Sequence, residues 1–339
     1  EMQSIRLLFL LVFSCAWLAT DALPLRPDLM SSTYDGTQQS GNRVEYINFG
    51  KLDQWVTRNI KESGIIGGKT KVIYAIGPTQ TINGNVAYLG LGGSPWATSN
   101  VYAHVAGIHK ANLSVWKQQR PGQGYCAKLY THLEECKVLG IVNIKVLAAG
   151  SLFLGQMMEP ISGVSNPMSK LNCGVRFNKK PSAIRFDYAV KLSGQPNRIK
   201  QTGFGGTKTI AGKDVADCIV YLQKRWEDAQ GNVYAKRIGT MVTRFSHNTG
   251  WVNNADFTIH YGDITHQPFY QSYMGLTSGE GRRYAKNSKG KMVPIQEVGW
   301  GSATDVPTHL IVQFDSSSGG AFIGSVGNTL WVDNIRLVY

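Results

Sequence analysis

Alternation of apolar and polar residues with a period of two constrains this chain more than any other feature of its sequence. In AIRFDYAVKL, residues 183–192, apolar side chains take the even positions, and Arg185, Asp187 and Lys191 take odd ones. Successive side chains of an extended strand point to opposite faces, so this pattern predicts a strand with one face on a core and the other toward solvent. Similar alternation recurs from Val44 to the C-terminus, broken by the Gly, Pro, Asn and Asp clusters that are typical of turns.

Candidate strands of this kind follow one another along the whole chain. They cover residues 69–77, 84–92, 125–133, 141–154, 255–261, 308–315 and 320–339. Residues 217–244 predict a hairpin, because two alternating runs flank the turn sequence AQGN. One short amphipathic helix is predicted over residues 53–63, where Trp55, Val56 and Ile60 share a stripe. About a dozen short strands without intervening helical runs predict an all-β fold, an antiparallel sandwich rather than a parallel sheet.

Composition agrees with a globular β protein. The 339 residues include 38 Gly, 15 Tyr, 12 Phe and 8 Trp, which favours strands and tight turns. A charged fraction of 17% and a hydrophobic fraction of 42% exclude a disordered chain and a coiled coil. The formal net charge of +13 is dispersed over predicted strand ends and loops. It is interpreted either as an ordinary solvated surface or as attraction to an anionic polysaccharide or cell surface.

The first residues predict an export signal, which argues against nucleic acid as the partner of this basic chain. Arg6 precedes the apolar run LLFLLVF, residues 7–13, which is far shorter than the roughly twenty residues that span a bilayer. Cleavage after Ala22, with small residues before the cut, predicts a signal peptide over residues 1–22.

A second interpretation of the same segment stays open. The sequence VFSC resembles a loose bacterial lipobox, in which Cys15 would be acylated and the protein held as a lipoprotein. In both cases we expect a flexible leader over residues 23–43, a single domain over residues 44–339, and a place in the periplasm, at the outer membrane or on the surface of a bacterium.

Four cysteines follow the predicted signal: Cys126, Cys136, Cys173 and Cys218. Their spacing matches no zinc-binding pattern. An exported protein can form disulfides, and Cys126 with Cys136 is the first pair to consider because ten residues can span a hairpin. Four free buried thiols are the alternative.

No sequence motif assigns a catalytic residue. GFGGTKT, residues 203–209, lacks the order of a phosphate-binding loop, and HExxH and GxSxG are absent. The acids near predicted turns are Glu227, Asp228, Asp256, Asp263, Glu280, Glu297 and Asp305. A glycosidase needs two carboxyl groups about 5 Å or about 6.5–9.5 Å apart, a separation that a sequence does not report. Each acid alone is typical of a solvated surface or turn.

Tryptophans among small and polar residues give the stronger signal. Trp96 in SPWATSN, Trp251 in HNTGWVNN and Trp300 in VGWGSATD lie outside the alternating runs. Sugar rings stack their apolar faces on aromatic side chains while neighbouring polar groups bind the hydroxyls. These three residues and Tyr273 are therefore the predicted carbohydrate-binding residues. The alternative is that the rings close the ends of a sandwich core.

In the final segment, GSVGNTLWVDNIRLVY, the acid Asp333 occupies a position where the alternation predicts an apolar residue. A period of two places Trp331, Ile335 and Leu337 on one face, and Asp333 on that same face. A carboxylate among core residues must be hydrogen-bonded, paired or bound to a cation, because burying it bare is costly.

The chain resembles a known family in several of these segments. GSPWATSNVY, VYLQKRWEDAQGNVYAKR, NSKGKMVPIQEVGWGSATDVPTHLIV and the closing GSVGNTLWVDNIRLVY are similar to the putative carbohydrate metabolism domain family of Bacteroidetes. The resemblance extends over residues 45–339 and is most specific toward the C-terminus. It implies a β jelly roll, similar to galactose-binding-like domains and carbohydrate-binding modules, in exported proteins of gut bacteria that process glycans.

The wider jelly-roll group also implies a role for Asp333. In many carbohydrate-binding modules a closing strand similar to LWVDNIRL supplies an Asp to a structural Ca²⁺. INFGKLDQW, residues 47–55, resembles the early segment that shares this ion, which makes Asp53 the second ligand and leaves backbone carbonyls to complete six to eight oxygens. A plain hydrogen bond from backbone amides or a hydroxyl to Asp333 is the alternative.

We therefore expect an exported glycan-associated protein that binds polysaccharide or oligosaccharide, with no cofactor required. Two alternatives stay open. One is a glycoside hydrolase on the same jelly roll, and the other is a structural or adhesion component of the cell envelope.

Overall fold

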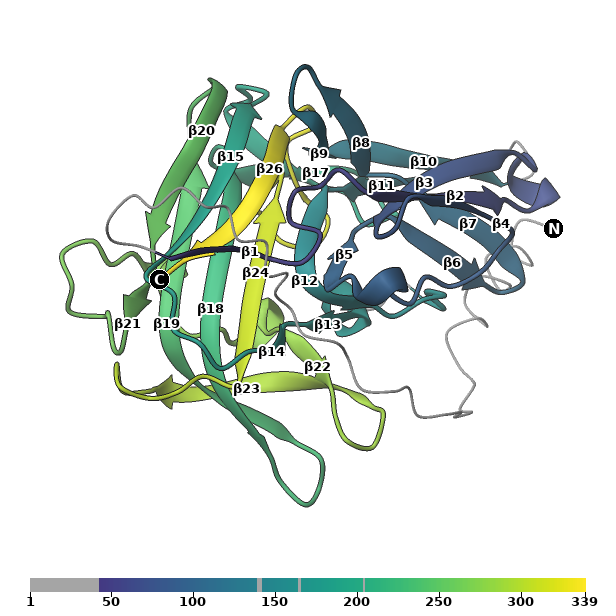
Figure 1. Ribbon diagram of the computed structural model, residues 1–339. Coiled ribbons are helices and arrows are strands. Elements are labelled where there is room, and N and C mark those ends of the chain that lie inside the picture. The colour runs from purple at the N-terminus through teal and green to yellow at the C-terminus, as the bar shows by residue number, and fades with distance from the viewer. Residues whose placement is uncertain (1–42, 139–141, 164–165, 204) are drawn as a thin grey trace.

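The computed structural model describes residues 43–138, 142–163, 166–203 and 205–339, and strands dominate it (Figure 1). The expected all-β class is confirmed. Among the described residues the helices are single 3-10 turns: η1 (Gly64–Ile66), η2 (Leu91–Gly93), η3 (Pro167–Lys170), η4 (Ser272–Met274) and η5 (Gly279–Gly281). None of these helices has the length or apolar character needed to cross a bilayer. The predicted signal peptide, Cys15 and the leader up to residue 42 lie outside the described residues.

The first of two large sheets contains strands from both ends of the described chain. Its order is β20-β15-β26-β9-β8, and β1 also pairs with β26. The bounds are β1 (Val44–Tyr46), β8 (Val115–Arg120), β9 (Gly124–Tyr130), β15 (Ala183–Lys191), β20 (Thr249–Thr258) and β26 (Thr329–Val338). All its pairings are antiparallel. The clearest alternating run of the sequence therefore forms β15, beside the closing strand β26.

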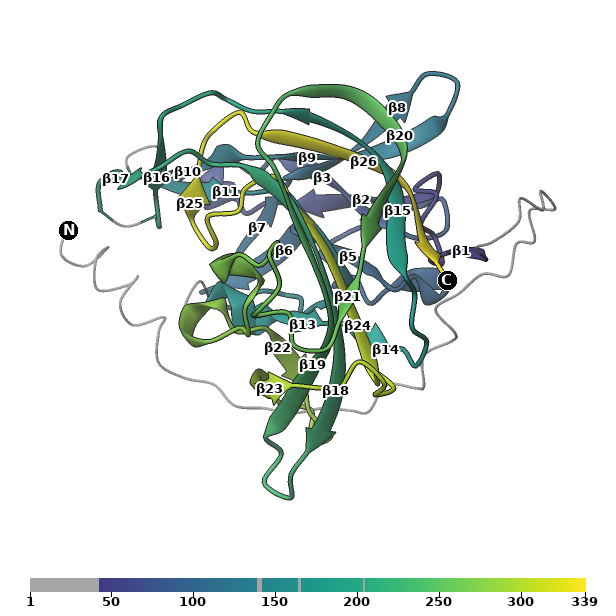
Figure 2. The ribbon, with the colours of Figure 1, turned by 90° about the vertical axis from the view of Figure 1, so that its left-hand side faces the viewer.

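The second large sheet has the order β14-β24-β18-β19-β23-β22-β13-β12-β5, with β21 paired to β19. The predicted hairpin forms its long central strands, which project beyond the body of the molecule (Figure 2). The bounds are β5 (Trp96–Thr98), β12 (Ser151–Met157), β13 (Leu171–Cys173), β14 (Val175–Arg176), β18 (Ala216–Glu227), β19 (Val233–Phe245), β21 (His260–Tyr261), β22 (Tyr284–Lys286), β23 (Met292–Trp300) and β24 (His309–Asp315).

Smaller sheets lie beside this sandwich. The first three, on the right in Figure 1, are β3-β2-β4, the hairpin β6-β7 and the hairpin β10-β11, and the fourth is β17-β16-β25. Their bounds are β2 (Trp55–Lys61), β3 (Thr70–Ile76), β4 (Gln80–Asn83), β6 (Val101–Val105), β7 (Ile108–Asn112), β10 (His132–Val138), β11 (Val142–Ala148), β16 (Asn197–Lys200), β17 (Lys208–Ala211) and β25 (Ile323–Gly324).

The largest apolar core lies between the two large sheets. Alternate residues of each strand enter it, as the period of two requires. They include Ile184, Phe186 and Val190 of β15, Cys218, Val220 and Leu222 of β18, and Leu310, Val312 and Phe314 of β24. The residues between them point away from the core. The sandwich therefore presents two outer faces, one on each sheet.

A β-bulge changes the facing of the closing strand. Leu330 and Val332 enter the core, but so do Ile335 and Leu337, so the inward positions change from even to odd. The left-handed φ of Asn334, 54°, and a register shift against β15 mark the extra residue. Trp331 and Asp333 consequently point to the outer face, whereas Ile335 and Leu337 point inward. The prediction that all four share one face is wrong.

Three other predictions differ from the structure. Residues 53–63 contain the strand β2 rather than a helix, because Trp55, Val56 and Ile60 are strong strand formers and β3 and β4 pair with both edges. Residues 84–92 contain no strand. The run at 141–154 forms two strands, β11 and β12.

All four cysteines of the described chain are free thiols, so the disulfide between Cys126 and Cys136 is not formed. Cys126, Cys173 and Cys218 are buried and Cys136 is partly buried. Burial raises the pKa of Cys126 to about 12, which keeps this thiol protonated and unreactive.

Candidate functional site

Aromatic rings and a lysine lie in a row across the outer face of the first sheet. Trp116 on β8 and Trp331 on β26 are both register partners of Lys128, on the intervening strand β9. The two tryptophans are therefore two strand spacings apart, about 10 Å. Tyr130 extends the row, with its ring centroid 5.8 Å from that of Trp116. All four side chains are partly exposed.

Strand β20 adds Trp251 to the same face. Its side chain is 37% exposed, and the guanidinium carbon of Arg120 lies 3.9 Å from its ring centroid. Such a cation–π contact fixes the orientation of the ring. We call the resulting surface the aromatic face, made of Trp116, Lys128, Tyr130, Trp251 and Trp331.

Arg120 also forms ion pairs with two buried carboxylates under this face. Its Nη1 donates to Asp187 Oδ2 at 2.8 Å and to Asp333 Oδ2 at 2.7 Å, and its Nη2 donates to Asn253 Oδ1 at 2.5 Å. The other oxygen of Asp333 accepts from the backbone N–H of Asn334 at 2.8 Å. Asp333 is therefore held by an ion pair with Arg120 and by a backbone hydrogen bond, and the backbone hydrogen bond was the alternative prediction for this residue.

The two acids under the aromatic face differ in acidity. Burial raises the pKa of Asp333 to about 6, although the hydrogen bond from Arg120 opposes this. Burial acts on Asp187 in the same direction. There, however, hydrogen bonds from the Asn254 backbone, Arg120 and Asn334 outweigh it and hold the pKa of Asp187 below its ordinary value.

These contacts do not fit the expected Ca²⁺ site. Asp333 already faces a guanidinium at 2.7 Å, and a second cation there would be repelled. Asp53 accepts a hydrogen bond from the Tyr125 backbone at 3.0 Å instead. In the part of the chain that the structure describes, no three His, Cys, Asp or Glu side chains gather as metal ligands would.

The aromatic residues predicted from sequence do not form one groove. Trp96 is 1% exposed and its indole N–H donates to the Asn48 carbonyl at 2.9 Å, so the prediction of an exposed ring there is wrong. Trp300 is the last residue of β23 on the second sheet, where it pairs with Arg237, and Tyr273 lies in η4, where its ring packs under Arg244. Of the predicted residues, Trp251 belongs to the aromatic face.

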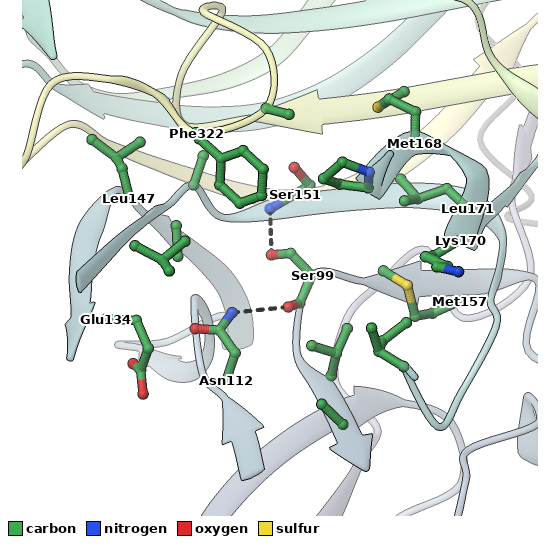
Figure 3. Close-up of a pocket in the computed structure, with 18 of the residues that line it drawn as sticks. Ser99, Asn112, Glu134, Leu147, Ser151, Met157, Met168, Lys170, Leu171 and Phe322 are labelled. Atoms are coloured by element: carbon green, nitrogen blue, oxygen red, sulfur yellow. Dashed lines mark hydrogen bonds between the residues drawn. The ribbon is translucent and has the colours of Figure 1, made fainter. Parts of the chain in front are cut away.

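A cavity of about 570 Å³ lies on the other outer face of the sandwich, between the second sheet and the small hairpins (Figure 3). Its walls are largely aliphatic. Figure 3 shows Leu147 on one side, Met157, Met168 and Leu171 on the other, and Phe322 between them. Ser162 and Ala321 are exposed lining residues, so the cavity reaches the surface.

The floor of this cavity is polar. Asp217 on β18 and Asp315 on β24 are register partners, so their side chains face each other on the same side of the sheet. Burial, then the negative charge of Asp315, raises the pKa of Asp217 well above its ordinary value. Burial also raises the pKa of Asp315, against hydrogen bonds from Ser151 and Gln313. Ionising both facing, buried carboxyls is therefore disfavoured.

Other acids named in the sequence have structural roles. The side chain of Glu297 on β23 is fully buried and pairs with Arg237 at 2.5 Å. The charge of Arg237 outweighs burial and lowers the pKa of Glu297. Asp256 pairs with Arg185 at 2.6 Å. Glu227, Asp228, Asp263 and Asp305 accept hydrogen bonds within turns or between neighbouring loops.

Residues 80–338 match the family described as putative carbohydrate metabolism domain. The chain belongs to this family. Two solved structures, both described as putative glycoside hydrolases, are similar to this carbohydrate metabolism domain. The one from Bacteroides thetaiotaomicron has 18% identity and a TM-score of 0.43, covering 80% of this chain and 76% of its own. The one from Bacteroides vulgatus has 16% identity and a TM-score of 0.37, covering 66% and 76%. The comparison with curated proteins gave no match.

The residues that are central to both outer faces were not predicted from the sequence. Trp116 and Trp331 occur in alternating runs, where a tryptophan is usually directed to the core. Asp217 was hidden in the run ADCIVYL, although it alternates with core residues and shares its face with Ile219 and Tyr221. An acid on a face that otherwise carries large apolar residues was the available signal.

Proposed function

We propose that this carbohydrate metabolism domain binds polysaccharide or oligosaccharide on its aromatic face, without hydrolysing it, as an exported accessory protein. The supporting observation is the row Trp116, Lys128 and Trp331 on one continuous sheet, with partly exposed rings two strands apart. This separation is close to the length of two pyranose units, so neighbouring indoles suit alternate sugars of an extended chain.

The polar groups among the rings suit sugar hydroxyls. The indole N–H of Trp331 donates to Gln118 Oε1 at 3.2 Å, which leaves the amide nitrogen of Gln118 for a ligand. Lys128 forms no ion pair with the described carboxylates, and its ammonium lies 5.7 Å from the Trp116 ring and 5.3 Å from the Tyr130 ring. An acidic group on the polysaccharide would therefore gain a charge partner at the centre of the row.

The acids near each face argue for binding rather than hydrolysis. Asp187 and Asp333 have side chains 6% and 0% exposed and are held by Arg120, so neither reaches a glycosidic oxygen above the rings. Asp217 and Asp315 are register partners only 5% and 8% exposed, and they lie on the other large sheet, away from the rings. Export rests on the sequence of residues 1–22.

Affinity electrophoresis through gels that contain neutral or anionic soluble polysaccharides tests this proposal. We expect at least one polysaccharide to retard the wild-type protein, and Trp331→Ala and Trp116→Ala to weaken binding about tenfold or more, the effect of about 1.4 kcal/mol. Trp226→Ala is the matched control. Trp226 is 44% exposed on the projecting hairpin, away from the aromatic face, and its loss should leave retardation unchanged.

Two results would contradict the proposal. In the first, both aromatic-face variants are retarded as strongly as the wild type, so that they do not differ from the control. In the second, the wild type releases reducing ends from the polysaccharide that it binds, which would favour a glycoside hydrolase.

A further inference from the structure

The cavity on the second sheet is chemically unlike the aromatic face. Its walls come from the β6-β7 hairpin, β11, β12, η3 and the loop before β25, and are represented by Val101, Ile108, Val146, Met157, Met168 and Phe322. Free saccharides expose hydroxyls in all directions and rely on aromatic planes for their apolar contacts. Aliphatic walls of this kind instead match a flexible hydrocarbon. A volume of about 570 Å³ falls in the usual range for small-ligand sites.

Unpartnered polar atoms point to a ligand at the floor of this cavity. Asp217 Oδ1, Gln313 Oε1 and Arg283 Nε are buried atoms without a hydrogen-bond partner, and all three residues line the cavity. The residues are 5%, 6% and 9% exposed. Most buried polar groups in proteins are hydrogen-bonded, and leaving one unmet is costly. Three such atoms at one end of an apolar cavity therefore indicate a polar group that completes them.

The floor of the cavity carries charged side chains of both signs. Asp315 accepts hydrogen bonds from the Ser151 hydroxyl and from Gln313 Nε2 at 2.7 Å, as an ionised carboxylate does. Asp217 has no such donor on Oδ1, and burial beside Asp315 raises its pKa well above the ordinary value, so Asp217 is the weaker acid of the pair. Arg283 supplies one positive charge that acts on both acids. Lys110, Glu134 and Lys170 also line the cavity, and Lys110 pairs with Glu134 at 2.7 Å. An anionic ligand end at the floor would face two acids, so a neutral polar end suits the floor better.

We propose that this cavity binds a neutral amphipathic molecule, whose aliphatic part lies among the walls and whose hydroxyl groups meet Asp217, Gln313 and Arg283. Two ligand hydroxyls would donate to Asp217 Oδ1 and Gln313 Oε1, and a ligand oxygen would accept from Arg283 Nε. A monoacylglycerol has this pattern: two hydroxyls, an ester oxygen and a single hydrocarbon chain. The site is separate from the aromatic face, so it does not depend on the proposed glycan binding.

A ligand series with one chain and different ends tests this proposal. We would measure binding of 1-monolauroylglycerol, laurate and dodecylphosphate to the whole protein by isothermal titration calorimetry, each below its critical micelle concentration. We expect 1-monolauroylglycerol to bind with one-to-one stoichiometry, and the two anionic ligands to bind at least about tenfold more weakly, because Asp217 and Asp315 would repel an anionic end at the floor. Glycerol alone should show no binding.

Matched variants locate the site. Asp217→Asn keeps the shape and neutrality of a protonated acid, so binding should stay within about threefold of wild type, whereas Asp217→Leu removes the acceptor and should weaken it about tenfold or more. Thermal unfolding of each variant identifies loss of fold. Trp331→Ala should bind 1-monolauroylglycerol normally, so a failure here is distinguishable from a failure of the glycan proposal. The inference is overturned if laurate binds as tightly as 1-monolauroylglycerol, or if the folded wild type binds neither.

Discussion

Replacement of Arg120 by Met removes the cation that lies between two buried carboxylates and keeps a side chain of similar length. In the wild type, Nη1 of Arg120 lies 2.8 Å from Asp187 Oδ2 and 2.7 Å from Asp333 Oδ2, and the three side chains are only 5%, 6% and 0% exposed. Removing one partner of a buried ion pair costs about 3–5 kcal/mol, because the remaining charge stays buried without compensation. We expect a loss of that size in the free energy of unfolding at pH 7.5.

The loss should depend on pH. Without Arg120 the two carboxylates repel each other, so their pKa values rise and protonation at pH 5 relieves part of the penalty. Urea denaturation followed by tryptophan fluorescence at pH 7.5 and pH 5 measures both values. The double variant Arg120→Met with Asp333→Asn is the control, and it should recover roughly 1–2 kcal/mol at pH 7.5 because one carboxylate no longer needs a cation. A loss below about 1 kcal/mol at pH 7.5, or an equal loss at both pH values, would refute the reasoning.

Two further predictions concern the closing strand. The pKa of Asp333 in the folded protein, about 6, exceeds its ordinary value of 3.8, so the folded state keeps a proton that the unfolded chain has released between these values. The contribution of Asp333 to the free energy of unfolding should therefore fall by about 2 kcal/mol as pH rises from 4 to 7. Urea denaturation of the wild type and of Asp333→Asn measures this contribution as the difference between their free energies of unfolding. A difference that is constant with pH would contradict the prediction. For Asn334, with φ of 54°, replacement by Ala should cost about 1 kcal/mol more than replacement by Gly, since both variants lose the side-chain hydrogen bond to Asp187 and Gly alone tolerates the left-handed backbone. Equal thermal stability of the two variants would show that the bulge has relaxed.

The sequence alone predicts the strands whose alternation is local. β15 follows from the alternation of apolar and polar residues, and the β18-β19 hairpin follows from two alternating runs that flank a short turn sequence. Residues 53–63 were ambiguous because a run this short satisfies both a period of two and a period near 3.6. There, pairing with β3 and β4 decides in favour of a strand, and neither partner strand is visible in the run itself.

The two outer faces depend on register, which the sequence does not report. Lys128 becomes the neighbour of Trp116 within the hairpin β8-β9, but the neighbour of Trp331 only when the distant strand β26 aligns with β9. Asp217 and Asp315 meet in the same way, across β18 and β24. The bulge at Asn334 also hides the face to which Trp331 points. A backbone φ of 54° does not change the apolar pattern, and the polar residue that adopts it here is one that many turns also contain.

That extra residue also has an evolutionary consequence. Asp333 and Arg336 are three residues apart on the closing strand, whereas their partners on β15, Asp187 and Arg185, are two residues apart. A gene that lost the codon for Asn334 would encode a strand with uninterrupted alternation, and Leu330, Val332, Ile335 and Leu337 would still point inward. Members of the family should therefore tolerate a one-codon deletion here with the interior intact. The deletion would remove the Asn334 amide that donates to Asp187, so the pair of Asp187 with Arg120 beneath the tryptophans would need other support or would be lost.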